Sequence, residues 1–117
     1  MTASATYYEY EVNEILTGAY PALPVMIVLA AGQNLPEGAL IGKITASGKY
    51  VLSLAAATDG SEVPVAITST PIDASSADEK GVAYVSGQFV TRHLTFGTGH
   101  TVASVKDGLR DLNIYLD

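Results

Sequence analysis

Short runs of strand-forming residues alternate with turn residues over positions 35–67, LPEGALIGKITASGKYVLSLAAATDGSEVPVAI. Ser47-Gly48 and Asp59-Gly60 are dipeptides that favour turns, and the runs between them are rich in valine, isoleucine, leucine and tyrosine. The segments between these turns are too short to form helices. The region therefore predicts several short strands that follow one another closely, and with them a mainly β fold.

The same pattern continues along the chain and leaves room for one helix. Over Thr101–Leu112 the residues Val102, Val105, Leu109 and Leu112 recur at helical spacing, with Thr101 or Ser104 as a cap and Gly108 as a sign of tight packing. The expected fold is mainly β (α+β) with one C-terminal helix. Strands are expected at 25–29, 39–45, 50–54, 63–68, 82–85, 88–96 and 114–116, with a turn at 32–38, a bulge or bend at Gly87, and an exposed polar loop at 73–80.

Composition excludes several classes of function. The 117 residues carry six basic and twelve acidic side chains, and the first base is Lys43, so no basic cluster is available for a nucleic-acid backbone. There is no cysteine for a disulfide or a thiolate site. The most apolar run, Val25–Ala31, is too short to span a membrane and predicts a buried strand. Only 15% of the residues are charged, which favours burial against partners.

No group of residues matches a known reaction or metal site. His93 and His100 are the two histidines, and no zinc-ligand spacing surrounds them. No Gly-x-Ser-x-Gly sequence is present, and the acidic pairs Asp59 with Glu62 and Asp78 with Glu79 fit turns and a solvated loop better than paired catalysis. We therefore expect no enzyme and no cofactor.

Two further segments resemble ligand loops only superficially. Residues 38–45, GALIGKIT, are one residue short of a phosphate-binding loop and place Ile44 where that loop needs Ser or Thr. Residues 73–79 are acidic but lack the central glycine and the final glutamate of a calcium-binding loop. Both segments are interpreted as ordinary strand and surface.

Residues 1–24 differ in composition from the rest of the chain. They hold four of the seven tyrosines and three glutamates, and they contain no Lys or Arg. In 8–12, YEYEV, strict alternation places Tyr8, Tyr10 and Val12 on one face of an extended strand. Gly18, Pro21 and Pro24 then interrupt regular structure. The segment either folds onto its own domain or adds as a strand to another chain.

The order of several short motifs resembles the head decoration protein D family of lambda-like phages. The resemblance covers about residues 25–117, and Ser86 stands where that family often has Arg. The motifs are Pro36-x-Gly38, Gly42-Lys43-Ile44, Ser47–Tyr50, Thr58–Ser61, Val65–Ile67, Val82–Phe89 and Leu109–Ile114.

The resemblance implies a small β-barrel or β-tulip-like domain (25–117) with a flexible N-terminal capsid-binding arm (1–24). It further implies a homotrimer, made in the host cytoplasm, that binds the major capsid protein on the outer surface of the expanded head at local threefold positions. There it would stabilise the capsid against internal DNA pressure. We expect Tyr7, Tyr8, Tyr10 and Val12 of the arm to contact the capsid, with no nucleic-acid or membrane partner.

Two alternatives come from other classes of function. One is a carbohydrate- or ligand-binding β module of a phage tail or cell-surface adhesin, in which exposed tyrosines would stack on the ligand. The concentration of tyrosines in the N-terminal segment argues against it. The other is a small enzyme, against which the absence of a nucleophile and base motif argues.

Overall fold

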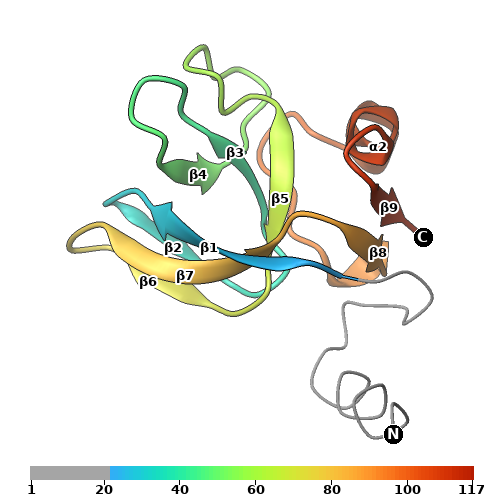
Figure 1. Ribbon diagram of the computed structural model, residues 1–117. Coiled ribbons are helices and arrows are strands. Elements are labelled where there is room, and N and C mark those ends of the chain that lie inside the picture. Colours follow the sequence, from blue (N-terminus) through green and yellow to red (C-terminus); the bar gives the residue numbers. More distant parts are fainter. Residues whose placement is uncertain (1–21) are drawn as a thin grey trace, which may run out of the picture.

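A computed structural model describes residues 22–117 and confirms a strand-rich fold with one α-helix (Figure 1). The strands are short, as the closely spaced turn residues predict. They are β1 (Pro24–Leu29), β2 (Gln33–Leu35), β3 (Leu40–Lys43), β4 (Tyr50–Leu52), β5 (Pro64–Thr68), β6 (Ile72–Ala74), β7 (Glu79–Tyr84), β8 (Gly87–Phe89) and β9 (Ile114–Leu116). A 3-10 turn, η1 (Thr91–His93), and the helix α2 (Val102–Arg110) lie between β8 and β9.

Five strands close into a barrel in the order β1-β4-β3-β5-β7, with β7 returning to β1. The long β1–β7 ladder is antiparallel, and the contact of β1 with β4 is parallel, at Leu29 opposite Tyr50. The β3–β5 ladder shifts register between Ile41 and Gly42. A Cβ atom at Gly42 would overlap the backbone carbonyl of Ser61, so only glycine allows the two segments to approach this closely.

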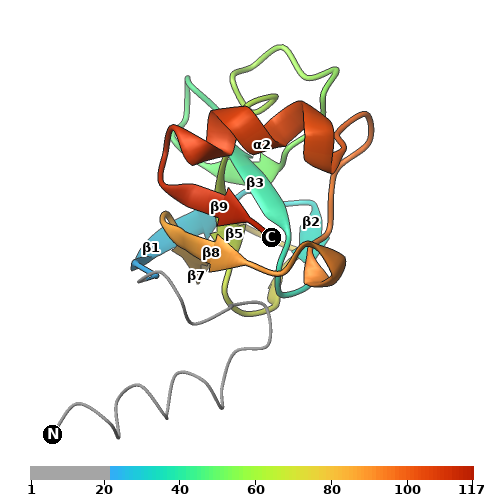
Figure 2. The same ribbon diagram turned by 90° about the vertical axis from the view of Figure 1, so that its right-hand side faces the viewer.

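A second layer covers one side of the barrel. It consists of the parallel pair β8–β9 and α2, which packs beside β9, and Figure 2 shows this layer in front of β3 and β5. The backbone amide of Asp117 donates to the carbonyl of Phe89, so the C-terminal strand is held against β8.

The layer encloses a second hydrophobic core outside the barrel. Strands β3 and β5 contribute to both cores. Ile41 and Ala66 face the barrel interior, whereas their neighbours Leu40 and Ile67 face the second layer. Strands that are buried on both faces read as continuous apolar runs, which accounts for the lack of alternation in 39–41 and 66–67.

The hydroxyl group of Thr68 joins the barrel to the Pro36-x-Gly38 segment. This side chain is fully buried, accepts a hydrogen bond from the amide of Ala39 at 2.9 Å and donates one to the carbonyl of Pro36 at 2.8 Å. The amide of Gly38 donates in turn to the backbone carbonyl of Thr68. Thr68, at the end of β5, thus holds the Pro36-x-Gly38 segment against the barrel.

Several predicted strand boundaries are wrong. The predicted turn at 32–38 contains β2, which pairs with β6, and the predicted loop at 73–80 is shortened by β6 and by the start of β7. The predicted strand 88–96 ends after Phe89, because the chain turns through η1, where the amide of Thr91 donates to the carbonyl of Asp117.

The helix is shorter than predicted, and only half of its apolar stripe is buried. Thr101 is the cap, and it exchanges hydrogen bonds with Ser104 in a capping box. Val105 and Leu109 are buried, whereas Val102 and Leu112 are 36% and 41% exposed. The chain leaves the helix through Asn113, which has a positive φ of 65°.

Candidate functional site

The predicted capsid-binding residues Tyr7, Tyr8, Tyr10 and Val12 lie outside the described residues. Their role, and the boundary of the arm at residue 24, stay predictions. The described chain begins at Ala22, and Leu23 is bonded to the two residues that follow β7: its amide donates to the carbonyl of Ser86, and its carbonyl accepts from the amide of Val85.

The acidic residues considered from sequence hold turns together. The Asp59 carboxylate accepts hydrogen bonds from the hydroxyl and the amide of Ser61, at 2.6 and 3.0 Å, and Glu62 accepts from the amide of Gly60. The hydrogen bonds from Ser61 hold the pKa of Asp59 below its ordinary value. Asp59 and Glu62 are therefore engaged in one turn and do not face each other across a cleft.

The acids of the 73–79 segment have comparable roles. Asp73 accepts from the hydroxyl and amide of Ser75, and these bonds lower its pKa. Asp78 forms an ion pair with Lys49 at 2.6 Å and accepts from the amide of Ala31; both interactions lower its pKa. Within residues 22–117 no group of three or more His, Asp or Glu side chains could hold a metal ion.

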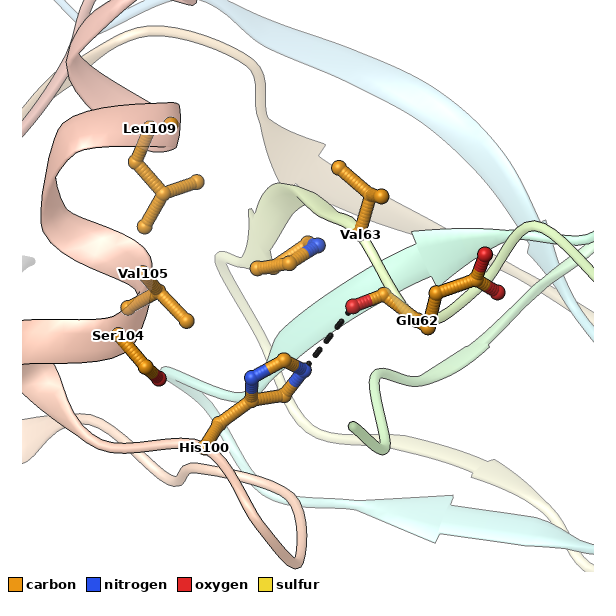
Figure 3. Close-up of a pocket in the computed structure, with 8 residues that line it drawn as sticks. Glu62, Val63, His100, Ser104, Val105 and Leu109 are labelled. Carbon is orange, nitrogen blue, oxygen red and sulfur yellow. Dashed lines mark hydrogen bonds between the residues drawn. The ribbon is translucent and has the colours of Figure 1, made fainter. Parts of the chain in front are cut away.

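His93 ends η1, whereas His100 lies in the loop before α2, where polar groups of two other segments surround it (Figure 3). Its Nε2 atom is 3.1 Å from the carbonyl oxygen of Glu62 and 3.1 Å from the hydroxyl of Ser53, which is fully buried. A carbonyl oxygen can only accept, so Nε2 carries the proton and donates. In that form Nε2, the atom that faces Ser53, cannot take a proton from it, and the contact links the 97–101 segment to the β4–β5 loop.

A pocket of about 180 Å³ lies between α2 and the start of β5 (Figure 3). Val105 and Leu109 line it from the helix, and Val63, which is 54% exposed, lies opposite. The complete lining is Glu62, Val63, Pro64, His100, Ser104, Val105, Gly108 and Leu109. The hydroxyl of Ser104 is committed to the helix cap and Nε2 of His100 to Glu62, and the rest of the lining is largely apolar, so the pocket suits an apolar group.

Gly108 is a correction to the sequence interpretation. We expected this glycine to permit tight packing inside the protein, but a Cβ atom built on it meets nothing within 4 Å. The helical glycine opens onto the pocket instead. Sequence alone could not show whether Gly108 is packed or open, because the spacing of the apolar residues does not indicate which sides of the helix other segments cover.

Sequence analysis also missed the most exposed large apolar side chain of the described residues. Val25–Ala31 was expected to be a buried strand, yet Met26 of β1 is 66% exposed. Since every residue of 25–31 is apolar, no alternation marks the outward positions.

The fold and the arrangement of its polar groups define a small β-rich domain, in which Asp59, Glu62, Asp73, Asp78 and His100 serve turns and loop contacts. The family model "Bacteriophage lambda head decoration protein D" matches residues 24–115, and the chain belongs to this family. No curated protein matches the chain.

Membership of this family makes the chain a decoration protein of a phage head and therefore a component of the virion capsid, and it implies a non-enzymatic role. The family resemblance identified from sequence is confirmed by the family match, which covers β1 to β8, the helix and the first two residues of β9. No helix in the described part of the chain is long and apolar enough to cross a membrane.

Proposed function

We propose that the protein binds as a homotrimer to the major capsid protein on the outer surface of the expanded head, and stabilises the head against the pressure of packaged DNA. The family match over residues 24–115 is the observation that carries this proposal. A trimer that contacts several capsid subunits acts as a clamp, because linked contacts raise avidity well beyond that of any single one.

Sedimentation with phage heads tests the role directly. The protein is expected to co-sediment with expanded heads and not with precursor heads, and decorated heads should retain DNA on heating or at low magnesium better than bare heads. Light scattering of the free protein should give the mass of a trimer. A monomer at micromolar concentration would remove assembly in solution from the proposal, although trimers could still form on the head.

Residues 1–24 form the proposed capsid anchor, with Tyr7, Tyr8, Tyr10 and Val12 as contacts. The alternation in 8–12 supports a strand that extends a capsid sheet edge while one face buries its apolar side chains. Each large apolar side chain buried in this way contributes roughly 1.5–3 kcal/mol to binding. Because a trimer carries three arms, loss of the arm should abolish binding.

Removal of residues 2–21 tests the anchor while it leaves the backbone bonds of Leu23 in place. Residues 22–117 contain both hydrophobic cores, so this variant should unfold at nearly the temperature of the full chain. It should no longer bind expanded heads. Undiminished binding would show that the arm is not the anchor.

A pair of double variants in the full chain separates the two faces of the proposed strand. Replacing Tyr8 and Tyr10 with serine should weaken head binding strongly. Replacing Glu9 and Glu11 with glutamine changes the opposite face of the strand and should have little effect. Equal losses in both variants would contradict a strand with one buried face.

A further inference from the structure

The outer face of the β1–β7 ladder is the most exposed apolar surface on a strand of the described domain. Ile27 and Leu29 point into the barrel and are 4% and 0% exposed, so the alternation of β1 turns Met26 outward, where it is 66% exposed. Val82 lies directly opposite Met26 on β7. Pro24 and Val28 flank Met26 on the same outward side of β1.

The second layer does not cover this face. Its hydrophobic core contains Leu40 of β3 and Ile67 of β5, and it reaches β7 only at Tyr84. No residue of β1 belongs to that core or to the partly buried residues that pack against it. Met26 therefore stays open within the described domain.

The charges on the two strands also suit a protein partner. The charged residues of β1 and β7 are Glu79 and Lys80, both exposed at the start of β7, and Lys80 lies opposite Val28. An apolar surface with its charges confined to one end suits a partner surface that is apolar over most of the contact.

The position at which the N-terminal segment joins the domain indicates which partner this is. Residues 1–21 connect to Ala22, and the backbone bonds of Leu23 with Val85 and Ser86 fix the chain at the start of β1. Leu23 is itself 55% exposed. The proposed contacts of the arm, residues 7–12, lie 14 to 19 residues before Met26 in the chain, so a partner that the arm binds is tethered near this face at a raised effective concentration.

We propose that the outer face of β1 and β7 around Met26 is a second contact surface, with which the domain body docks onto the same head shell that the arm binds. This inference rests on the proposed function. The arm would supply the anchor, and the Met26 face would fix the orientation of the domain on the shell.

A substitution in the full chain tests the contact without removing the arm. Met26→Glu should weaken binding to expanded heads by about ten- to a hundredfold, because a large apolar side chain loses its burial and a charge is placed in the contact. Met26→Leu should bind nearly as the wild type does. Leu112→Glu is the matched control, since Leu112 is also exposed but lies beyond α2; it should leave head binding unchanged.

Three measurements separate the outcomes. The unfolding temperature and the light-scattering mass of Met26→Glu should equal those of the wild type. If the light-scattering mass of Met26→Glu were lower than that of the wild type, the inference would be overturned, because Met26 would then lie in a contact between copies of this chain. Undiminished head binding by Met26→Glu would overturn the inference alone, whereas failure of the wild type to bind expanded heads would overturn the proposed function as well.

Discussion

Thr68 illustrates how much one buried hydroxyl can fix. Thr68→Val keeps the shape of the side chain but leaves the amide of Ala39 and the carbonyl of Pro36 without this partner in a buried site. The free energy of unfolding should fall by about 2–3 kcal/mol, since each unsatisfied buried group is costly. Urea denaturation measures the loss.

Thr70→Val is the control for this substitution, because Thr70 is exposed two residues further along the chain. It should change the free energy of unfolding by no more than about 0.5 kcal/mol. If both variants lost the same stability, the effect would come from replacing a hydroxyl with a methyl group at any position and not from the buried hydrogen bonds of Thr68.

Asp59 should make the stability of the protein depend on pH in the acid range. Its folded pKa lies below the ordinary value of 3.8, chiefly because of the Ser61 hydroxyl. A depressed carboxyl pKa contributes stability that is complete well above 3.8 and is lost as the pH falls through the folded value. The difference in unfolding temperature between the wild type and Asp59→Ala should therefore be largest near neutral pH and shrink below about pH 4. A difference that stays constant down to pH 2 would contradict this account.

At the scale of elements, the helix and the loop before it offer a contrasting pair of glycine substitutions, at Gly108 and Gly97. Gly108→Ala should raise the free energy of unfolding by up to about 1 kcal/mol, because alanine favours the helix and its Cβ atom meets no neighbour. Gly97→Ala should lower it, because the new Cβ atom would overlap the carbonyl of Ser53. Thermal unfolding of both variants measures the contrast. Destabilisation by Gly108→Ala would restore the sequence-based interpretation of tight packing at this glycine.

The elements also show which sequence signals were sufficient. Turn residues and apolar runs located β3, β4 and β5 closely, because local chemistry determines where such strands begin and end. The β2–β6 pair was not found, since Gln33-Asn34 and Asp73 are polar and only their pairing makes them strands. Similarly, the 88–96 run stops at Phe89 because of a contact with Asp117, far along the chain.

At the scale of the whole molecule, the two hydrophobic cores are expected to unfold together. They share β3 and β5, so disruption of either core loosens the walls of the other. Phe89→Ala, in the second core, should lower the free energy of unfolding by about 3–5 kcal/mol. Calorimetry should still show one transition. Two separate transitions would mean that the barrel is stable without its second layer.

The functional features differ in how far the sequence could predict them. The family role follows from the order of motifs in 35–67 and 82–114, which the family match confirms. The exposed face at Met26 and the pocket beside Gly108 could not be foreseen, because both depend on where the second layer ends. In a purely apolar strand such as β1, the sequence does not indicate which face is exposed to solvent.

The parallel pairing of β9 with β8 has a consequence for the order of folding during synthesis. The barrel has all its strands once β7 has left the ribosome, but β9 follows about thirty residues later. Until then Leu40, Ile67 and Phe89 lack the cover that Ile114 and Leu116 provide. The nascent chain therefore passes through a stage at which an apolar barrel wall faces solvent, when aggregation or capture by a chaperone competes with completion of the fold.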